Sequence, residues 1–145
     1  MNKFAKIAVP LAILLIFISG CTDKSTNSPY GELLSQPPYA SLTDSIKNQP
    51  DNDELYFRRA VLLNTNELPE PSLDDFKKAW NLKKDERYAF GISNLLLDRK
   101  PDSAILFLRE ALEELPASTL LQLTLARCYE TQNKNEEALT LCNSI

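Results

Sequence analysis

The side chains that most often carry out catalysis are scarce in this chain of 145 residues. It contains no histidine, so an imidazole base, a histidine-activated nucleophile and a histidine metal ligand are all excluded. After Cys21 the only glycines are Gly31 and Gly91, too few for a glycine-rich loop that holds phosphate. The adjacent acids Asp74 and Asp75 are expected near a helix start, where carboxylates complement the helix dipole. We therefore predict a non-catalytic protein with no metal and no cofactor.

Cys21 is the residue whose sequence surroundings indicate a covalent modification. It follows the apolar run Ile7–Ile18, which comes after Lys3 and Lys6 and ends at two small residues. At about 1.5 Å per residue, a helix of this length covers roughly 18 Å and is too short for a hydrocarbon core of about 30 Å. A short apolar run between lysines and small residues is typical of a secretory signal peptide.

The tetrapeptide ISGC, residues 18–21, resembles the lipobox of bacterial lipoproteins. In that family the cysteine thiol receives a diacylglycerol group, and cleavage then leaves the cysteine as the first residue. The resemblance implies that Cys21 is the lipidation site of a lipoprotein, with acyl chains such as palmitate, and that residues 1–20 are a removed signal peptide. The alternative is an ordinary signal peptide, or an anchor, with an incidental cysteine.

The same resemblance implies a location in the bacterial cell envelope. In enterobacterial lipoproteins an aspartate directly after the cysteine marks retention in the inner membrane. Thr22 occupies that position here, which favours the outer membrane, although Asp23 is one place further on.

The charge of the chain limits its partners. Lys and Arg number 16 against 20 Asp and Glu, for a net charge of −4, and loss of residues 1–20 would remove two lysines and no acid. An acidic protein is a poor candidate for binding nucleic acid, or for holding a membrane by basic patches. We expect a protein or peptide partner, and membrane contact through the lipid on Cys21.

Two further cysteines, Cys128 and Cys142, do not have the spacing of a CxxC zinc or redox motif. We expect two buried apolar thiols, with a disulfide as the alternative.

Composition divides the remaining chain in two. Residues 21–38 are rich in Ser, Thr, Asn and Pro and show no periodicity, which predicts a lipidated N-terminus and a flexible tether that ends at Pro37-Pro38. From Tyr39 onward, segments of about 10 to 14 residues between prolines and polar clusters predict helices. Pro71 and Pro101 are expected in first turns, and Asp53 and Ser118 as N-caps. LQLTL, residues 121–125, alternates like a strand and leaves helix or strand open locally.

Internal repetition resolves that ambiguity. Two copies superpose at a spacing of 34 residues, with Tyr88 on Gln122 and Ala104 on Ala138, and an earlier copy superposes at 32. The chain resembles tetratricopeptide repeat (TPR) proteins, whose pattern is W-x2-L-G-x2-Y, then A-x3-F, then P. The matching residues are Ala60, Phe76 and Ala79 in the first copy, Ala104, Ala111 and Pro116 in the second, and Leu125, Ala126, Tyr129 and Ala138 in the third. Ile92, Ser72 and Lys84 depart from the pattern.

This resemblance covers residues 39–145 and implies an all-α fold. We expect a right-handed superhelical solenoid of TPR-like antiparallel helix pairs after the signal peptide and flexible tether. The predicted units are a half-repeat over 39–50 and repeats over about 53–84, 85–118 and 119–145, the last of them incomplete.

The resemblance also implies a concave groove lined by the first helix of each repeat, which binds a peptide or a partner helix. By the family register the groove residues are Phe57, Val61, Asn64, Ser93, Leu96, Leu123, Arg127 and Glu130, together with Glu54, Glu86 and Ala89. Phe57 and Val61 replace the lysine and asparagine with which some members bind C-terminal carboxylates. The mixed apolar and acidic lining predicts a partner segment with apolar and basic residues.

Two functions follow from this resemblance. The first is a membrane-anchored, non-catalytic module for protein–protein interaction in the cell envelope. The alternative is a structural subunit of an envelope complex for outer-membrane protein assembly or pilus biogenesis, where TPR lipoproteins occur. The last predicted helix reaches Ile145 without a closing proline. We expect a piece of a longer array, or an end that docks on a partner or a second copy, with a fraying natural end as the alternative.

Overall fold

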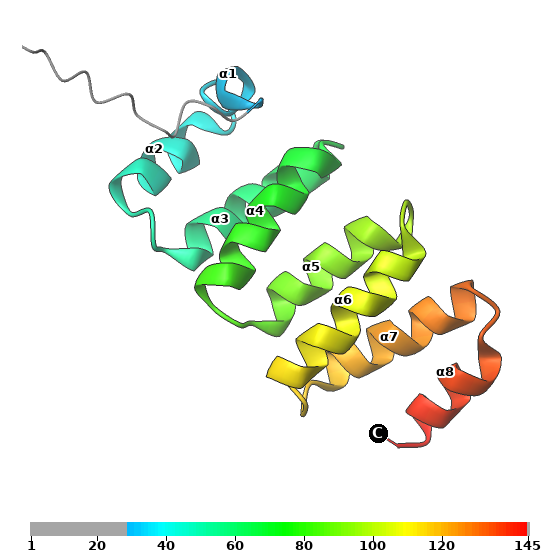
Figure 1. The fold of residues 1–145 in the computed structure, drawn as a ribbon. Coiled ribbons are helices and arrows are strands. Elements are labelled where there is room, and N and C mark those ends of the chain that lie inside the picture. Colours follow the sequence, from blue (N-terminus) through cyan, green and yellow to red (C-terminus); the bar gives the residue numbers. More distant parts are fainter. Residues whose placement is uncertain (1–28, 145) are drawn as a thin grey trace, which may run out of the picture.

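The computed structural model of the protein describes residues 29–144, and the regular structure in this range is entirely helical (Figure 1). The helices are α1 (Gly31–Leu34), α2 (Ala40–Asn48), α3 (Asp53–Thr65), α4 (Pro69–Leu82), α5 (Glu86–Leu97), α6 (Pro101–Glu114), α7 (Thr119–Thr131) and α8 (Asn135–Cys142). Residues 121–125 lie inside α7, so the strand alternative is wrong. Cys21 and the apolar run before it lie outside the described residues, and the signal peptide and lipid anchor stay predictions.

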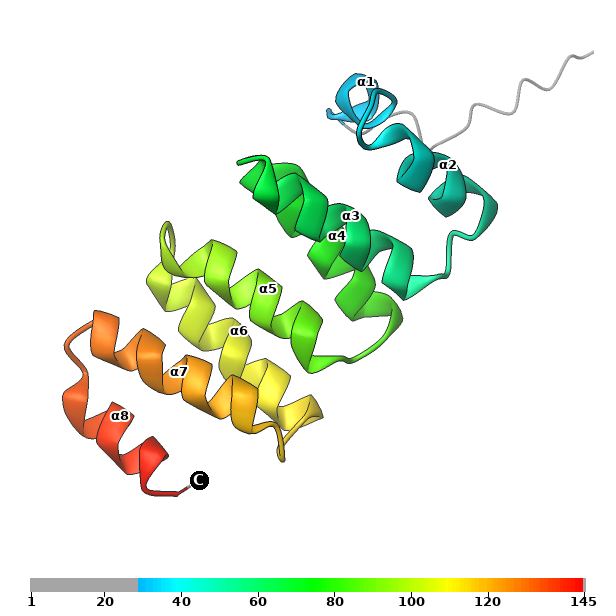
Figure 2. The ribbon, with the colours of Figure 1, turned by 180° about the vertical axis from the view of Figure 1, so that it is seen from behind.

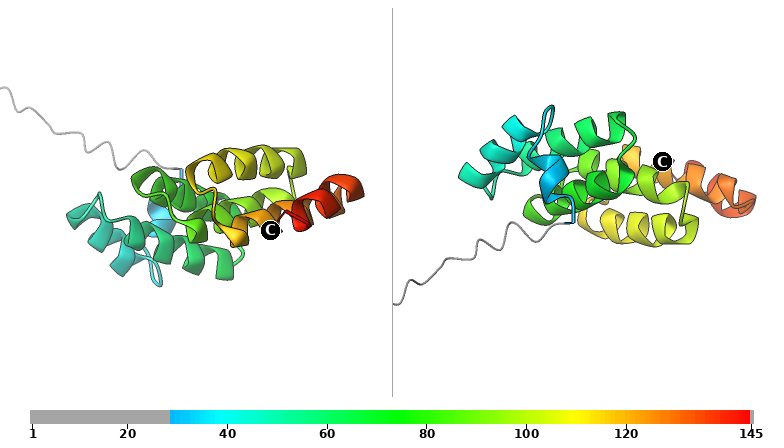
Figure 3. Two further views of the ribbon diagram at one scale, coloured as in Figure 1. Left: turned by 90° about the horizontal axis from the view of Figure 1, so that it is seen from below. Right: turned by 90° about the horizontal axis from the view of Figure 1, so that it is seen from above.

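The helices form a stack of antiparallel pairs, α3 with α4, α5 with α6 and α7 with α8 (Figures 1 and 2). Each pair also contacts the next through α4 with α5 and α6 with α7. Views from below and above follow the stack from α2 at one end to α8 at the other (Figure 3). The all-α, TPR-like helical repeat solenoid expected from the sequence is therefore confirmed.

Local sequence explains where these helices begin. Pro101 is the first residue of α6, where its missing N–H costs no hydrogen bond. Ser118 caps α7, because its hydroxyl oxygen accepts a hydrogen bond from the backbone N–H of Leu121 at 3.2 Å. The expectation for Asp53 is wrong, because Asn52 is the N-cap of α3. The Asp53 carboxylate instead accepts a hydrogen bond from the Tyr88 hydroxyl at 2.5 Å.

The predicted tether is partly folded, which corrects its boundary at Pro37-Pro38. Residues 31–34 form α1, and Leu34 and Tyr39 are buried in a small apolar cluster with Leu63 of α3. The hydroxyl of Thr43 in α2 also donates to the carbonyl oxygen of Leu34 at 2.7 Å. Burial against α3 thus orders a stretch whose composition alone resembles a linker.

The core consists of large side chains packed against small ones. Ala60, Ala104 and Ala138 are buried in α3, α6 and α8, as the repeat pattern predicts. Small side chains allow helices to approach closely, and bulky residues fill the space between the pairs. The largest fully buried members are Tyr88, Leu63, Ile92, Leu108 and Leu121.

The two downstream cysteines differ from each other. Cys128 is buried in α7, as expected, and burial raises the pKa of its thiol. Cys142 is exposed at the end of α8, so the expectation that it is buried is wrong. Neither of these two cysteines forms a disulfide.

Asp75 does not lie at a helix start, which corrects the interpretation of the Asp74-Asp75 pair. Because α4 begins at Pro69, both acids fall in its interior. Asp75 is buried and forms a two-pronged ion pair with buried Arg59 of α3: Nε donates to Oδ2 at 2.6 Å and Nη2 donates to Oδ1 at 2.8 Å. Burial raises the pKa of the Asp75 carboxyl, and the Arg59 guanidinium offsets part of that effect.

This ion pair belongs to a chain of hydrogen bonds that joins four helices. Arg59 Nη1 donates to Thr43 Oγ1 at 2.9 Å, and Thr43 donates in turn to the carbonyl of Leu34. The chain therefore runs from α1 through α2 and α3 to Asp75 in α4. It holds the N-terminal helices on the first helix pair.

We expect Arg59→Met to lower the free energy of unfolding by about 3–5 kcal/mol, because Asp75 would stay buried without its counter-ion. Urea denaturation measures the change. Arg58→Met is the matched control, since Arg58 is the exposed neighbour, and it should change the free energy by less than about 0.5 kcal/mol.

The pH dependence tests the cause. Without Arg59, desolvation raises the pKa of folded Asp75 further above its ordinary value of about 3.9. In the folded variant the Asp75 carboxyl then keeps its proton to higher pH than it does in the unfolded chain. The free energy of unfolding of the variant therefore falls as pH rises from about 4 towards 7. We expect the deficit to be smaller near pH 4. A deficit that does not change with pH, or no recovery in Arg59→Met/Asp75→Leu, would contradict this account.

Candidate functional site: the face of α3, α5 and α7

The first helices of three successive pairs meet at one cavity of about 340 Å³. α3 contributes Phe57, Val61 and Asn64, α5 contributes Arg87, Phe90, Gly91, Asn94 and Leu95, and Phe76 of α4 and Leu120 of α7 complete the lining. Its walls are mainly apolar, and two asparagine amides and one guanidinium supply the polar groups. We call this cavity and the exposed residues of α7 beside it the groove.

The groove residues expected from the sequence fall into two groups. Phe57, Val61 and Asn64 line the cavity as expected. Leu123, Arg127 and Glu130 are exposed on α7. Val61 and Leu123 are 44% and 52% exposed, so apolar side chains are open to solvent on the helices that carry the cavity.

On α5 the expected register is wrong. Ser93 and Ala89 are fully buried, and Leu96 is half-buried against the core, so none of the three lines the cavity. α5 packs directly against α7, and small side chains permit that close contact. Phe90 and Asn94 face the cavity instead. They are one helical turn apart, but Ala89 and Ser93 have the same i, i+4 spacing, so spacing alone does not separate these two faces of α5.

Gly91 shapes the cavity by allowing an aromatic ring to approach. A Cβ atom built at Gly91 would lie 2.6–2.8 Å from three ring carbons of Phe76, closer than real Cβ contacts. Phe76 comes from α4 of the preceding pair and also contacts Phe57, with ring centroids 5.9 Å apart. The ring of one pair thus occupies the space that a side chain at position 91 would fill.

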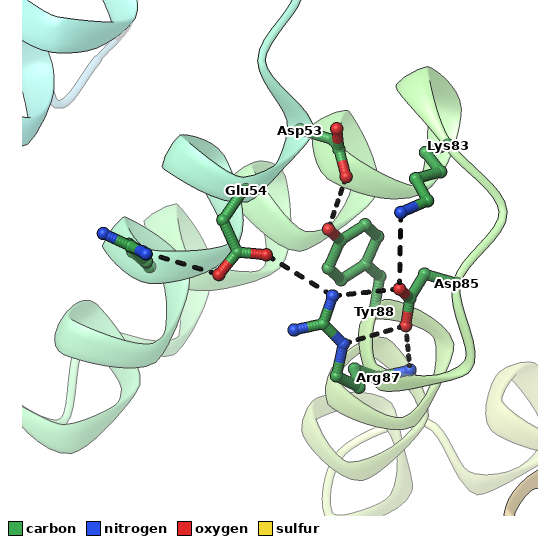
Figure 4. A network of polar contacts seen from close by, with 7 residues as sticks. Asp53, Glu54, Lys83, Asp85, Arg87 and Tyr88 are labelled. Atoms are coloured by element: carbon green, nitrogen blue, oxygen red, sulfur yellow. Dashed lines mark hydrogen bonds and ion pairs between the residues drawn. The ribbon is translucent and has the colours of Figure 1, made fainter.

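A network of charges lies at one edge of the groove, where α3 and α5 begin (Figure 4). Arg87 donates to Asp85 through Nε at 3.0 Å and through Nη2 at 2.9 Å, and Nη2 lies 3.4 Å from Glu54 Oε2. The hydrogen bonds from Arg87 lower the pKa of Asp85, whereas burial raises the pKa of the Tyr88 hydroxyl. The guanidinium carbon of Arg87 lies 4.9 Å from the ring centroid of Phe57, a cation–π contact at the cavity wall.

A larger cavity, of about 780 Å³, lies between α1–α2 and α3–α4. Its wall includes Arg59 and Asp75, but these two groups satisfy each other and Thr43. No buried polar side-chain atom of residues 29–144 lacks a hydrogen-bond partner. The same holds for the groove cavity, and we regard the groove as the better candidate site because the first helices of three successive pairs meet there.

Within residues 29–144, no group of three or more His, Cys, Asp or Glu side chains is placed to hold a metal ion. None of the helices described there has the length and apolar character needed to cross a membrane.

Comparison with known proteins agrees with this architecture for part of the chain. Residues 95–145, from the end of α5 through α8, match the tetratricopeptide repeat family. This part of the chain is similar to TPR proteins. Tetratricopeptide repeats generally mediate protein–protein interactions and are typically not catalytic. No curated protein matches the chain.

We expect Gly91→Ala to destabilise the protein by about 1–3 kcal/mol, because the new methyl group meets the confined ring of Phe76. Helix propensity alone predicts the opposite sign, a gain of about 1 kcal/mol. Urea denaturation decides between these effects. The double variant Gly91→Ala/Phe76→Leu is the control, since loss of the ring should remove most of the added cost of alanine. A higher urea midpoint for Gly91→Ala alone would show that the ring does not limit this position.

Proposed function

We propose that this protein is a membrane-anchored, non-catalytic module that binds a polypeptide segment in the groove between α3, α5 and α7. The observation that carries the proposal is the cavity shared by three first helices, with the exposed apolar side chains of Val61 and Leu123 on those helices. Apolar side chains of a partner would fill the cavity and cover these residues. The similarity of residues 95–145 to tetratricopeptide repeats supports this class of function.

The other exposed apolar residues are a weaker basis for binding. Leu106 on α6 and Leu139 on α8 are 60% and 64% exposed, but neither lines the groove cavity. Single exposed apolar side chains are common on protein surfaces. In the alternative function, a structural subunit of an envelope complex, such residues on the outer surface of the stack would contact the other subunits.

The membrane anchor is the second part of the proposal, and it rests on the sequence ISGC. Lipidation of Cys21 would fasten the chain a few residues before Pro29, the first described residue. A fully extended chain spans at most about 3.6 Å per residue, so Pro29 would stay within about 30 Å of the membrane surface. We propose an envelope location, with the outer membrane favoured by Thr22.

We expect a photo-crosslinking amino acid at Val61 or Leu123 to capture one partner in the cells that produce the protein. The same substitution at Leu106 or Leu139 should capture little, because those residues lie away from the groove. Mass spectrometry of the cross-linked bands measures the result. Val61→Asp should abolish the cross-link formed at Leu123, whereas Leu106→Asp should not. Strong capture at Leu106 and Leu139 alone would favour the structural-subunit alternative and exclude the groove.

We expect Cys21→Ala to abolish fatty-acid labelling and membrane fractionation, while the helical domain still folds. The reason is that the proposed acyl chains attach at the thiol of Cys21, and anchoring by more than one chain is stable. Metabolic labelling with palmitate and cell fractionation measure the outcome. Cys142→Ala is the matched control, since Cys142 is an exposed cysteine far along the chain. Label retained in the Cys21→Ala protein would refute the lipoprotein proposal.

A further inference from the structure

We infer that the cavity of about 780 Å³ between α1–α2 and α3–α4 binds an aromatic side chain of a partner polypeptide. We call this cavity the recess. It shares no lining residue with the groove cavity, although both take residues from α3, so it is a second site beyond the proposed function. The inference follows from what fills the equivalent place in the next helix pair.

The recess is a regular feature of the stack, formed over one first helix by the second helices on either side of it. Its lining includes Arg59 of α3 and Asp75 of α4. Copies of the repeat are spaced by 32 and then 34 residues, so these positions become Leu125 and Leu141 in the third copy. Both line another cavity, of about 610 Å³, among α6, α7 and α8. The same repeat positions therefore build this hollow at two places in the stack.

In the middle copy an aromatic ring takes this place. The position of Asp75 becomes Phe107 on α6, and the ring of Trp80 packs on it from α4, the preceding second helix. The two ring centroids are 5.9 Å apart in an edge-to-face arrangement, which is favourable for aromatic rings, and Trp80 is 7% exposed. The side chain that fits between these two second helices is thus aromatic, and it is presented by a helix.

The recess is open because its wall on α2 has no aromatic side chain: that wall consists of Thr43, Ile46 and Lys47. Its floor on α3 includes the ring of Tyr56, and Lys78 Nζ lies 5.8 Å from the centroid of that ring. A partner ring placed here would contact the Tyr56 ring and the Lys78 ammonium, which attract aromatic rings through edge-to-face packing and cation–π contact.

The charges around the recess favour a neutral anchor over a charged one. Two of its cations are already paired within the protein, Lys47 with Asp44 and Arg59 with Asp75. Three charged residues of the lining have no ion-pair partner within residues 29–144, namely Lys78, Glu32 and Asp74. Because one of them is basic and two are acidic, a partner charge of either sign would meet a like charge.

The size of the recess agrees with a bulky anchor. Its volume of about 780 Å³ lies within the range for ligand sites, about 300–1,000 Å³. An aromatic side chain buries about 150–250 Å² and therefore gains most from such a hollow. Trp80 reaches the equivalent place as part of a helix, which favours a polypeptide as the source of the ring.

The test uses the full chain in phosphatidylcholine nanodiscs and two neutral peptide probes, with binding measured by the broadening of fluorine NMR signals. The aromatic probe is a capped peptide with fluorotryptophan between glycine and serine residues. The aliphatic probe has trifluoroleucine in its place. Empty nanodiscs give the baseline for binding to lipid.

We expect the aromatic probe to bind about three- to tenfold more tightly than the aliphatic probe. Lys78→Ala should weaken the aromatic probe about two- to fivefold, the effect of a cation–π contact at an exposed site. Lys77→Ala is the matched control, because Lys77 is the exposed neighbour on α4 and does not line the recess. It should leave the affinity unchanged.

A second pair of variants tests the location. Ser35 lines the recess, so Ser35→Trp adds a ring of the protein itself that should compete with the aromatic probe and reduce its binding. Ser41 is exposed on α2 and does not line the recess, so Ser41→Trp should not reduce it. Circular dichroism and urea midpoints establish that each variant keeps its fold.

Four outcomes would overturn the inference. Equal binding of the two probes would reject the aromatic anchor, and full binding to the Ser35→Trp protein would reject the recess. Loss of binding in Val61→Asp would place the probe in the groove. Binding that occurred only in Cys21→Ala would assign the recess to the acyl chain of the protein itself. Cross-linking at Val61 and Leu123 tests the groove separately, so the proposed function can stand when this inference fails.

Discussion

The structure depends on one constraint: a single helix pair cannot bury its own apolar face, so each pair must pack against the next. The contact between Phe76 and Gly91 shows how this constraint also builds the site. The side chain of Phe76 extends from α4 to lie against Gly91 of α5 in the next pair, and its ring forms one wall of the groove cavity. Packing between pairs and the shape of the cavity are therefore consequences of the same contact, and neither can change without the other.

Charge follows a similar division between interior and surface. Arg59 and Asp75 are buried and neutralise each other, and they join α3 to α4 within the first helix pair. Arg87 is exposed, but Asp85 and Glu54 compensate it, and its flat guanidinium lies over Phe57 as part of the cavity wall. Arg127 lies on the same face without a carboxylate in ion-pair range among the described residues. The position of each arginine relative to nearby acids thus decides whether its charge is neutralised within the protein.

The repeat pattern was enough to predict the helices and their pairing, because it reports a periodic need for small and large side chains. It resolved residues 121–125, where local alternation suggested a strand. It could not find the partner of Asp75, since that pair depends on the exact faces that α3 and α4 turn towards each other. It also misplaced the groove residues of α5, where Ala89 and Ser93 are fully buried. Packing between neighbouring helices sets such details, and one sequence carries only a weak signal for it.

The folding of residues 29–38 has a consequence for the proposed anchor. Local composition predicted a linker there, because a segment rich in Ser, Pro and Gln does not reveal that α3 offers an apolar surface to pack against. Leu34 and Tyr39 cover that surface at Leu63, and Thr43 fixes the carbonyl of Leu34. Because residues 29–38 belong to the folded part, fewer residues separate it from Cys21 than composition predicted. An extended linker from Cys21 to Pro38 would reach about 60 Å, whereas one that ends at Pro29 reaches about 30 Å. The proposed lipid at Cys21 would then hold Pro29, and with it the start of the helical stack, within about 30 Å of the membrane.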